Sequence, residues 1–140
     1  MQLVTFEEML KTRLEASGGV RSVKTYRDVA YPEWYGLIVE VDGGTVPIRL
    51  TRGSGAGDPP MTEAEQAAHD ANIARGTKGN KPQLRYGPPQ VQAVETLIRE
   101  VLAADPPPAS TLVEGRIDGR ELPGVRVRFE SGLEIYAKPE

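Results

Sequence analysis

The sequence predicts an α+β fold in which antiparallel β-sheet packs against two main amphipathic helices. Two patterns predict it. Apolar residues recur at helical spacing near the start of the chain and again after residue 88, and they alternate with polar residues in several short segments bounded by turns. A length of 140 residues is enough for one hydrophobic core, so we expect a single domain over residues 1–140.

Composition excludes several kinds of chemistry. The chain has no cysteine and one histidine, which excludes disulfide scaffolds, thiolate metal sites and histidine-rich metal centres. Its net charge of −3 argues against a general electrostatic affinity for nucleic acid or anionic membranes. No apolar run approaches the roughly 20 residues that cross a bilayer, and the first residues lack a signal-peptide pattern. We therefore expect a cytoplasmic protein without membrane association.

A first helix is predicted from Thr5 to Gly18. Thr5 and Glu8 have the spacing of a capping box, and Gly18 can supply the left-handed residue that ends a helix. The apolar residues between them keep helical spacing: Phe6, Met9, Leu10 and Leu14.

Three strands are predicted next, over about residues 20–29, 35–41 and 46–50. A two-residue loop at Gly43-Gly44 would place Val41 opposite Val46 and put every apolar partner on one face. Pro47 cannot donate a backbone hydrogen bond, so its strand is predicted to lie at a sheet edge.

Residues 53–87 change in character and are predicted to form a flexible insertion. A glycine-rich linker covers residues 53–60, a short helix follows over about residues 62–75, and a loop continues to residue 87. The glycine run follows a strand as a dinucleotide motif does, but an Asp-Pro-Pro sequence stands where a helix should begin, so we predict no nucleotide cofactor.

The second half repeats the pattern. A helix is predicted from Pro88 to about Asp105, with strands over about residues 111–117, 124–129 and 133–137. A three-residue loop from Glu130 to Gly132 would set Arg128 beside Glu134. Four arginines on these strands could form a basic face, but nearby glutamates favour a mixed-charge surface: Arg116, Arg120, Arg126 and Arg128.

Residues 1–52 and 88–140 therefore resemble each other in organisation. When the sequence is aligned with itself at an offset of 88 residues, the apolar stripe of the helix, the alternation along the strands and the glycine of the turn coincide. Sequence identity between the halves is too low to decide between an internal αβββ duplication and two generic amphipathic units that meet by chance.

Two groups of side chains are candidate binding sites. Four aromatic residues lie within ten positions, and tyrosine and tryptophan are enriched at protein interfaces: Tyr26, Tyr31, Trp34 and Tyr35. A basic segment over residues 75–86 ends in an aromatic residue and could clamp a nucleic-acid backbone or another anion: Arg75, Lys78, Lys81, Arg85 and Tyr86. Glu65 and His69 are spaced like a pair of metal ligands, but the sequence offers no third, so we predict no metal site.

The absence of a recognisable catalytic constellation favours a small non-catalytic module for protein–protein interaction or assembly. Its partner would be another protein or a second copy of the chain. Size and composition would suit an accessory or structural protein of a phage or mobile element. The alternative is a nucleic-acid-binding regulator that uses residues 75–86. A third hypothesis, an enzyme, would depend on Asp, Glu, Tyr, Lys or Ser groups whose grouping the sequence does not reveal.

Overall fold

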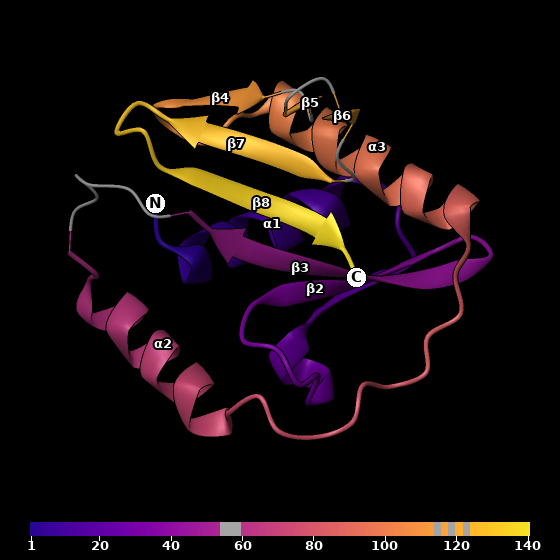
Figure 1. Cartoon of the computed structure of the whole chain (residues 1–140), viewed down its shortest axis with the longest axis horizontal. Coiled ribbons are helices and arrows are strands. Elements are labelled where there is room, and N and C mark those ends of the chain that lie inside the picture. The colour runs from indigo at the N-terminus through magenta and orange to yellow at the C-terminus, as the bar shows by residue number, and fades with distance from the viewer. Residues whose placement is uncertain (54–59, 114–115, 118–119, 122–123) are drawn as a thin grey trace.

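A six-stranded antiparallel sheet organises the computed structural model, which describes residues 1–53, 60–113, 116–117, 120–121 and 124–140. The predicted α+β class is confirmed (Figure 1). The elements in chain order are α1 (Leu3–Ser17), β1 (Ser22–Thr25), the 3-10 helix η1 (Tyr26–Val29), β2 (Gly36–Val41), β3 (Gly44–Arg52), α2 (Glu63–Arg75), α3 (Pro88–Ala104), β4 (Ser110–Val113), β5 (Arg116–Ile117), β6 (Arg120–Glu121), β7 (Val125–Phe129) and β8 (Glu134–Pro139).

The two halves of the chain meet in the middle of this sheet. The strand order is β1-β2-β3-β8-β7-β4, so β3 of the first half pairs with β8 of the second, and β5 with β6 forms a separate two-stranded sheet. Each half therefore contributes a helix and then three strands that run from one edge of the sheet to its centre. Arg49 on β3 lies opposite Lys138 on β8 at this junction.

Strand pairing is similar in the two halves, but the register differs by one residue. Val39 on β2 lies between Val23 and Val46, and the residue 88 positions later, Val127 on β7, lies between Leu112 and Ile135. Each partner of Val127 lies one position beyond the residue that the offset of 88 gives, so the two halves share a topology with a register shifted by one residue.

Helices α1 and α3 cover one face of the sheet. Their apolar stripes share one buried cluster with the inward side chains of the strands, which places the main core between the helices and the sheet. Leu10, Leu14, Val94 and Ile98 are fully buried helix positions in this core. No helix in the described parts of the chain has the length and apolar character needed to cross a membrane.

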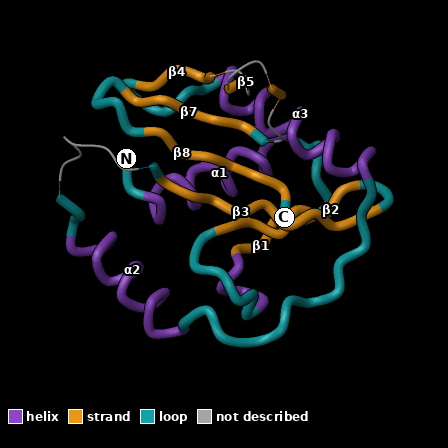
Figure 2. The backbone as a smooth tube through the Cα atoms, in the orientation of Figure 1, coloured by secondary structure: helices purple, strands orange, loops and turns teal. Residues whose placement is uncertain are grey.

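A smaller apolar cluster lies on the opposite face of the first half. Tyr26, Tyr31 and Ile38 are buried there, and Val29 and Leu84 pack against them. The segment after α2 returns past this cluster toward α3 (Figure 2), and its Arg85 carbonyl accepts from the Thr45 amide at 2.8 Å.

The β2–β3 hairpin corrects one predicted register. Its two-residue loop is Asp42-Gly43, with Val41 opposite Gly44 and Val39 opposite Val46, whereas the prediction used Gly43-Gly44. Gly43 has a φ of 87° in this loop, a conformation that glycine adopts without steric cost. The slip of two positions leaves each side chain on its predicted face, because side chains alternate with a period of two.

The prediction that Pro47 marks an edge strand is wrong. β3 lies inside the sheet between β2 and β8. Pro47 is tolerated because it lies just beyond the end of the β3–β8 pairing, where its carbonyl accepts from the Glu140 amide and no donor is needed from its own nitrogen.

Element boundaries in the first half differ from prediction, notably at α1 and β1. α1 begins at Leu3 rather than Thr5, and the Thr5 hydroxyl donates to Glu65 instead of capping the helix. The first strand ends at Thr25 because Thr25 and Asp28 form a capping box that begins η1. Gly18 ends α1 in the left-handed conformation as predicted.

The later elements follow the sequence more closely. α2 and α3 occupy their predicted ranges, and the β7–β8 register is confirmed, with Arg128 opposite Glu134. The strand predicted over residues 111–117 is divided between β4 and β5. Of the predicted linker, residues 54–59 lie outside the described part of the chain.

Candidate functional site

Helix α2 is attached to the body of the protein by polar contacts rather than by an apolar stripe. Thr62 and Glu65 form a capping box at its start. At its other end Asn72 is fully buried and donates to the backbone oxygen of Trp34. Arg75 donates to the backbone oxygens of Tyr31 and Glu33. The last turn of α2 therefore fixes the backbone of residues 31–34.

A buried carboxylate fixes the same region from the other side. Glu7 on α1 is fully buried, accepts from the Arg27 guanidinium, and accepts from the Gly36 amide at 3.0 Å. Burial raises the pKa of the Glu7 carboxyl, while Arg27 and the Gly36 amide oppose this rise. Glu7 thus joins α1, η1 and the start of β2, next to Tyr35.

The structure separates the four candidate aromatic residues. Tyr26 and Tyr31 stack at 4.2 Å between ring centroids, are buried, and donate their hydroxyls to Glu140. Burial and the nearby Glu140 carboxylate raise the pKa of both phenols. Tyr35 is also buried, whereas Trp34 is 46% exposed. Trp34 is the one member of the group that offers a large aromatic surface to a partner.

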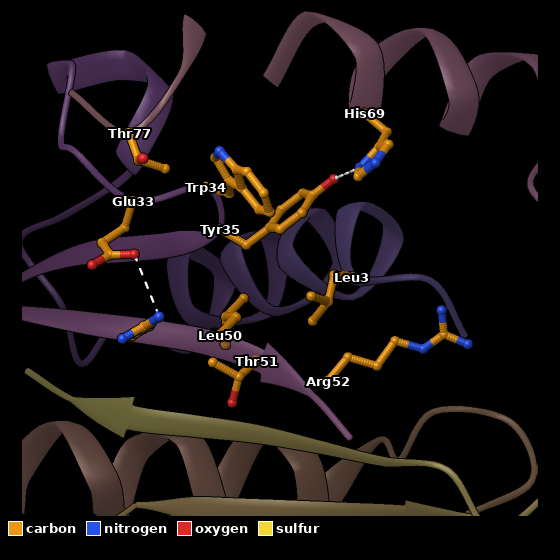
Figure 3. A pocket seen from close by; sticks show the side chains of 10 residues that line it. Leu3, Glu33, Trp34, Tyr35, Leu50, Thr51, Arg52, His69 and Thr77 are labelled. Carbon is orange, nitrogen blue, oxygen red and sulfur yellow. Dashed lines mark hydrogen bonds and ion pairs between the residues drawn. The ribbon is translucent and has the colours of Figure 1, made fainter. Parts of the chain in front are cut away.

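Trp34 borders a cleft of about 480 Å³ between α2 and the end of β3 (Figure 3). Leu3 and Leu50 supply apolar surface, and the side chains of Trp34 and Tyr35 lie next to each other in the view. Polar and charged side chains complete the lining: Glu33, Arg49, Thr51, Arg52, His69 and Thr77.

The charged groups of the cleft are positioned by neighbours. Arg49 lies 3.5 Å from the Glu33 carboxylate and remains 48% exposed. Arg52 donates to the side-chain oxygen of Gln2 at 3.1 Å. His69 is hydrogen-bonded through Nδ1 to the Tyr35 hydroxyl, with the two rings nearly parallel. Arg49 therefore presents a partly exposed guanidinium group to the cleft.

The basic segment is used differently from what its sequence indicates. Arg75 donates to backbone oxygens, and Lys81 lies 3.6 Å from the Glu140 carboxylate and 5.9 Å from the centre of the Tyr31 ring. Tyr86 donates its hydroxyl to the backbone oxygen of Glu140. Lys78 and Arg85 are exposed. These five residues therefore divide between internal contacts and solvent.

Glu65 and His69 also have separate partners. Glu65 accepts from Thr5 and from the backbone of Thr62, while His69 contacts Tyr35. Within the described ranges, no group of three or more His, Cys, Asp or Glu side chains is placed to hold a metal ion.

Sequence reasoning missed the two arginines of the cleft. Arg49 alternates with the inward residues Ile48 and Leu50, so strand parity already placed it away from the core. Its proximity to Trp34 depends on the fold, because β2 and β3 must pair before these residues meet. Leu3 was missed because the predicted helix began two residues later.

No family model matches this chain, and no curated protein or solved structure matches it either.

Proposed function

We propose that the protein is a non-catalytic interaction module whose cleft beside Trp34 binds a short segment of a partner protein. The observation that carries the proposal is the exposure of Trp34 beside a cleft, in a segment whose other aromatic residues are buried. Tryptophan is among the residues most enriched at the energetic centres of protein interfaces.

The exposed indole gives the interaction a source of free energy. An aromatic side chain can bury about 150–250 Å², and burial contributes about 25 cal/mol per Å². Covering the exposed 46% of Trp34 would therefore contribute about 2–3 kcal/mol before other contacts. Leu3, which is partly exposed, extends the apolar surface into the cleft.

Hydrogen bonds also fix the backbone that carries Trp34. Asn72 and Arg75 hold the backbone of residues 31–34, and the Glu7 contact with Gly36 fixes the residues that follow. A site whose backbone is already fixed loses less conformational entropy on binding. This support favours a binding role for the exposed indole.

The lining indicates the chemistry of the partner segment. The volume of the cleft is in the range of sites that take a ligand or a few residues of a peptide. Arg49, which remains half exposed, favours a carboxylate close to the group that covers Trp34, since arginine can bind carboxylates through two hydrogen bonds. The expected segment has a large apolar residue beside Asp or Glu.

The alternative function, nucleic-acid regulation through residues 75–86, has less support. Arg75 and Lys81 make internal contacts that a phosphate backbone would have to replace. We therefore favour the cleft over the basic segment.

A displayed library of random peptides tests the proposal. Selection on the native protein should enrich peptides with a large apolar residue next to Asp or Glu. Trp34→Ala should abolish this enrichment, whereas Ile73→Ala, which removes a similarly exposed apolar side chain from α2, should retain it. Circular dichroism should show that both variants fold. Enrichment that survives Trp34→Ala would contradict the proposal.

A further inference from the structure

The open face of the sheet in the second half differs in character from the equivalent face of the first half. Ile38 and its cross-strand partner Pro47 are buried, and Ile38 lies beneath the cluster formed by Tyr26 and Tyr31. The equivalent pair on β7 and β8 is Arg126 and Tyr136. Where the first half is apolar and covered, the second half presents a charged and aromatic surface.

Glu134 lies on this face and contacts other polar side chains there. It accepts from the Arg128 guanidinium at 2.8 and 2.9 Å, accepts from the Tyr136 hydroxyl at 2.6 Å, and lies 3.6 Å from Arg126. The Glu134 side chain is 16% exposed, whereas that of Arg128 is 54% exposed. An approaching ligand therefore meets the guanidinium group of Arg128 more than the carboxylate that orients it.

The surface is continuous with the Trp34 cleft. Lys138 lies opposite Arg49 and Tyr136 lies opposite Thr51, and both Arg49 and Thr51 line the cleft. Lys138 is exposed, with its ammonium group 5.3 Å from the centre of the Tyr136 ring. Exposed positive charges are thus present on three successive strands, at Arg49 in the cleft, at Lys138 on β8 and at Arg128 on β7.

We propose that this face, defined by Arg128, Tyr136 and Lys138, is a second subsite that binds a run of acidic residues in the same partner segment. The inference rests on the proposed function, because the apolar residue in the Trp34 cleft places the acidic run over the sheet. Charge complementarity selects this occupant: the exposed groups are cations, whereas the Glu134 carboxylate is largely covered. The subsite determines which partners bind, and Trp34 provides the anchor.

Two blocked peptides without tryptophan test the subsite. Both carry one Phe anchor beside a Glu, and they differ only in whether the following residues are Glu or Gln. The protein variants are the double substitution Arg128→Gln/Lys138→Gln and a control, Arg21→Gln/Lys24→Gln. The control removes two exposed positive charges from the region of β1. Affinity is measured by titrating the fluorescence of Trp34, the only tryptophan of the chain.

The native protein should bind the Glu-run peptide about fivefold to tenfold more tightly than the Gln-run peptide. Arg128→Gln/Lys138→Gln should remove this preference and leave the affinity for the Gln-run peptide unchanged, while the control variant keeps the preference. The preference should also weaken as salt concentration rises, because exposed charges are screened.

Other results would overturn the subsite in distinguishable ways. A preference that persists in Arg128→Gln/Lys138→Gln would overturn the subsite and leave the proposed function standing. Failure of the native protein to bind either peptide would contradict the proposed function and the subsite together. A single-stranded oligonucleotide that binds more tightly than the Glu-run peptide, and loses affinity in the same variant, would assign the face to nucleic acid instead.

Discussion

The side-chain amide of Asn72 donates to the backbone oxygen of Trp34, so the last turn of α2 holds the backbone of the chain's only tryptophan. The contact joins residues 38 positions apart in sequence. It links a helix with few apolar residues to the aromatic residue that borders the cleft.

Arg75→Ala should detach the end of α2. It removes the donor to the backbone oxygens of Tyr31 and Glu33, and loss of a partner by a buried polar group costs about 1–3 kcal/mol. Chemical denaturation should show this decrease in unfolding free energy, and limited proteolysis should cleave α2 faster. Lys78→Ala removes an exposed charge nearby and serves as the control. Equal stability of the two variants would contradict the role given to Arg75.

Glu7→Ala should destabilise the fold far more than Glu8→Ala. Glu7 is fully buried between Arg27 and the Gly36 amide, whereas its neighbour Glu8 is exposed on the same helix. Removing one member of a buried ion pair costs about 3–5 kcal/mol, and an exposed substitution costs less than about 0.5 kcal/mol. Urea denaturation of both variants measures the difference. A Glu7→Ala protein as stable as Glu8→Ala would show that the buried carboxylate is not structural.

Stability should depend on pH through Glu134. The Tyr136 hydroxyl and Arg128 lower the pKa of the Glu134 carboxyl below its usual range, against the opposing effect of burial. The folded state then binds fewer protons than the unfolded state, so this contribution is complete above the ordinary pKa of about 4.5 and is lost as pH falls through the lowered pKa.

The unfolding free energy of Glu134→Gln should therefore decrease less steeply than that of the native protein as the pH falls. Denaturation at a series of pH values measures the slope, with Glu130→Gln at an exposed position as the control. An unchanged slope in Glu134→Gln would contradict the stabilising role of this carboxylate.

Gly36→Ala should destabilise the start of β2. A methyl group at this position would lie 2.3 Å from two ring atoms of Tyr26 and 2.6 Å from the Ile48 carbonyl oxygen, so the buried ring would have to move. Overpacking of this kind costs about 1–3 kcal/mol. At Gly53 the corresponding contacts are 3.6 and 3.8 Å, so Gly53→Ala is the matched control. Thermal unfolding should separate the two variants, and equal transition temperatures would contradict the close packing.

The sequence was most informative where the pattern is local and periodic. Side-chain alternation placed Val39 and Val127 on the core face, and this assignment survived the wrong β2–β3 register because the error was two residues. The β7–β8 register was predicted because a three-residue loop ending in Gly132 has few alternatives. The sequence Asp42-Gly43-Gly44 contains two overlapping pairs that suit a two-residue loop, so it does not decide between the two registers.

The candidate site depended on contacts that local patterns do not contain. Four neighbouring aromatic residues look alike in sequence, and only the packing of η1 and α2 decides that Tyr26, Tyr31 and Tyr35 are buried while Trp34 is exposed. Arg75 seemed free to bind an anion because the carbonyl groups that it contacts lie more than 40 positions earlier. Likewise, the central position of β3 follows from its pairing with β8.

Fluorescence of Trp34 during a peptide titration tests the central claim most directly, because the indole borders the cleft and no other tryptophan contributes. A blocked peptide with a Phe anchor beside Glu should produce a saturable shift to shorter wavelength and protect the indole from acrylamide quenching. The same peptide with Lys in place of Glu should bind at least about fivefold more weakly. An emission spectrum that stays unchanged with both peptides, or that responds equally to both, would contradict an acid-selective cleft at Trp34.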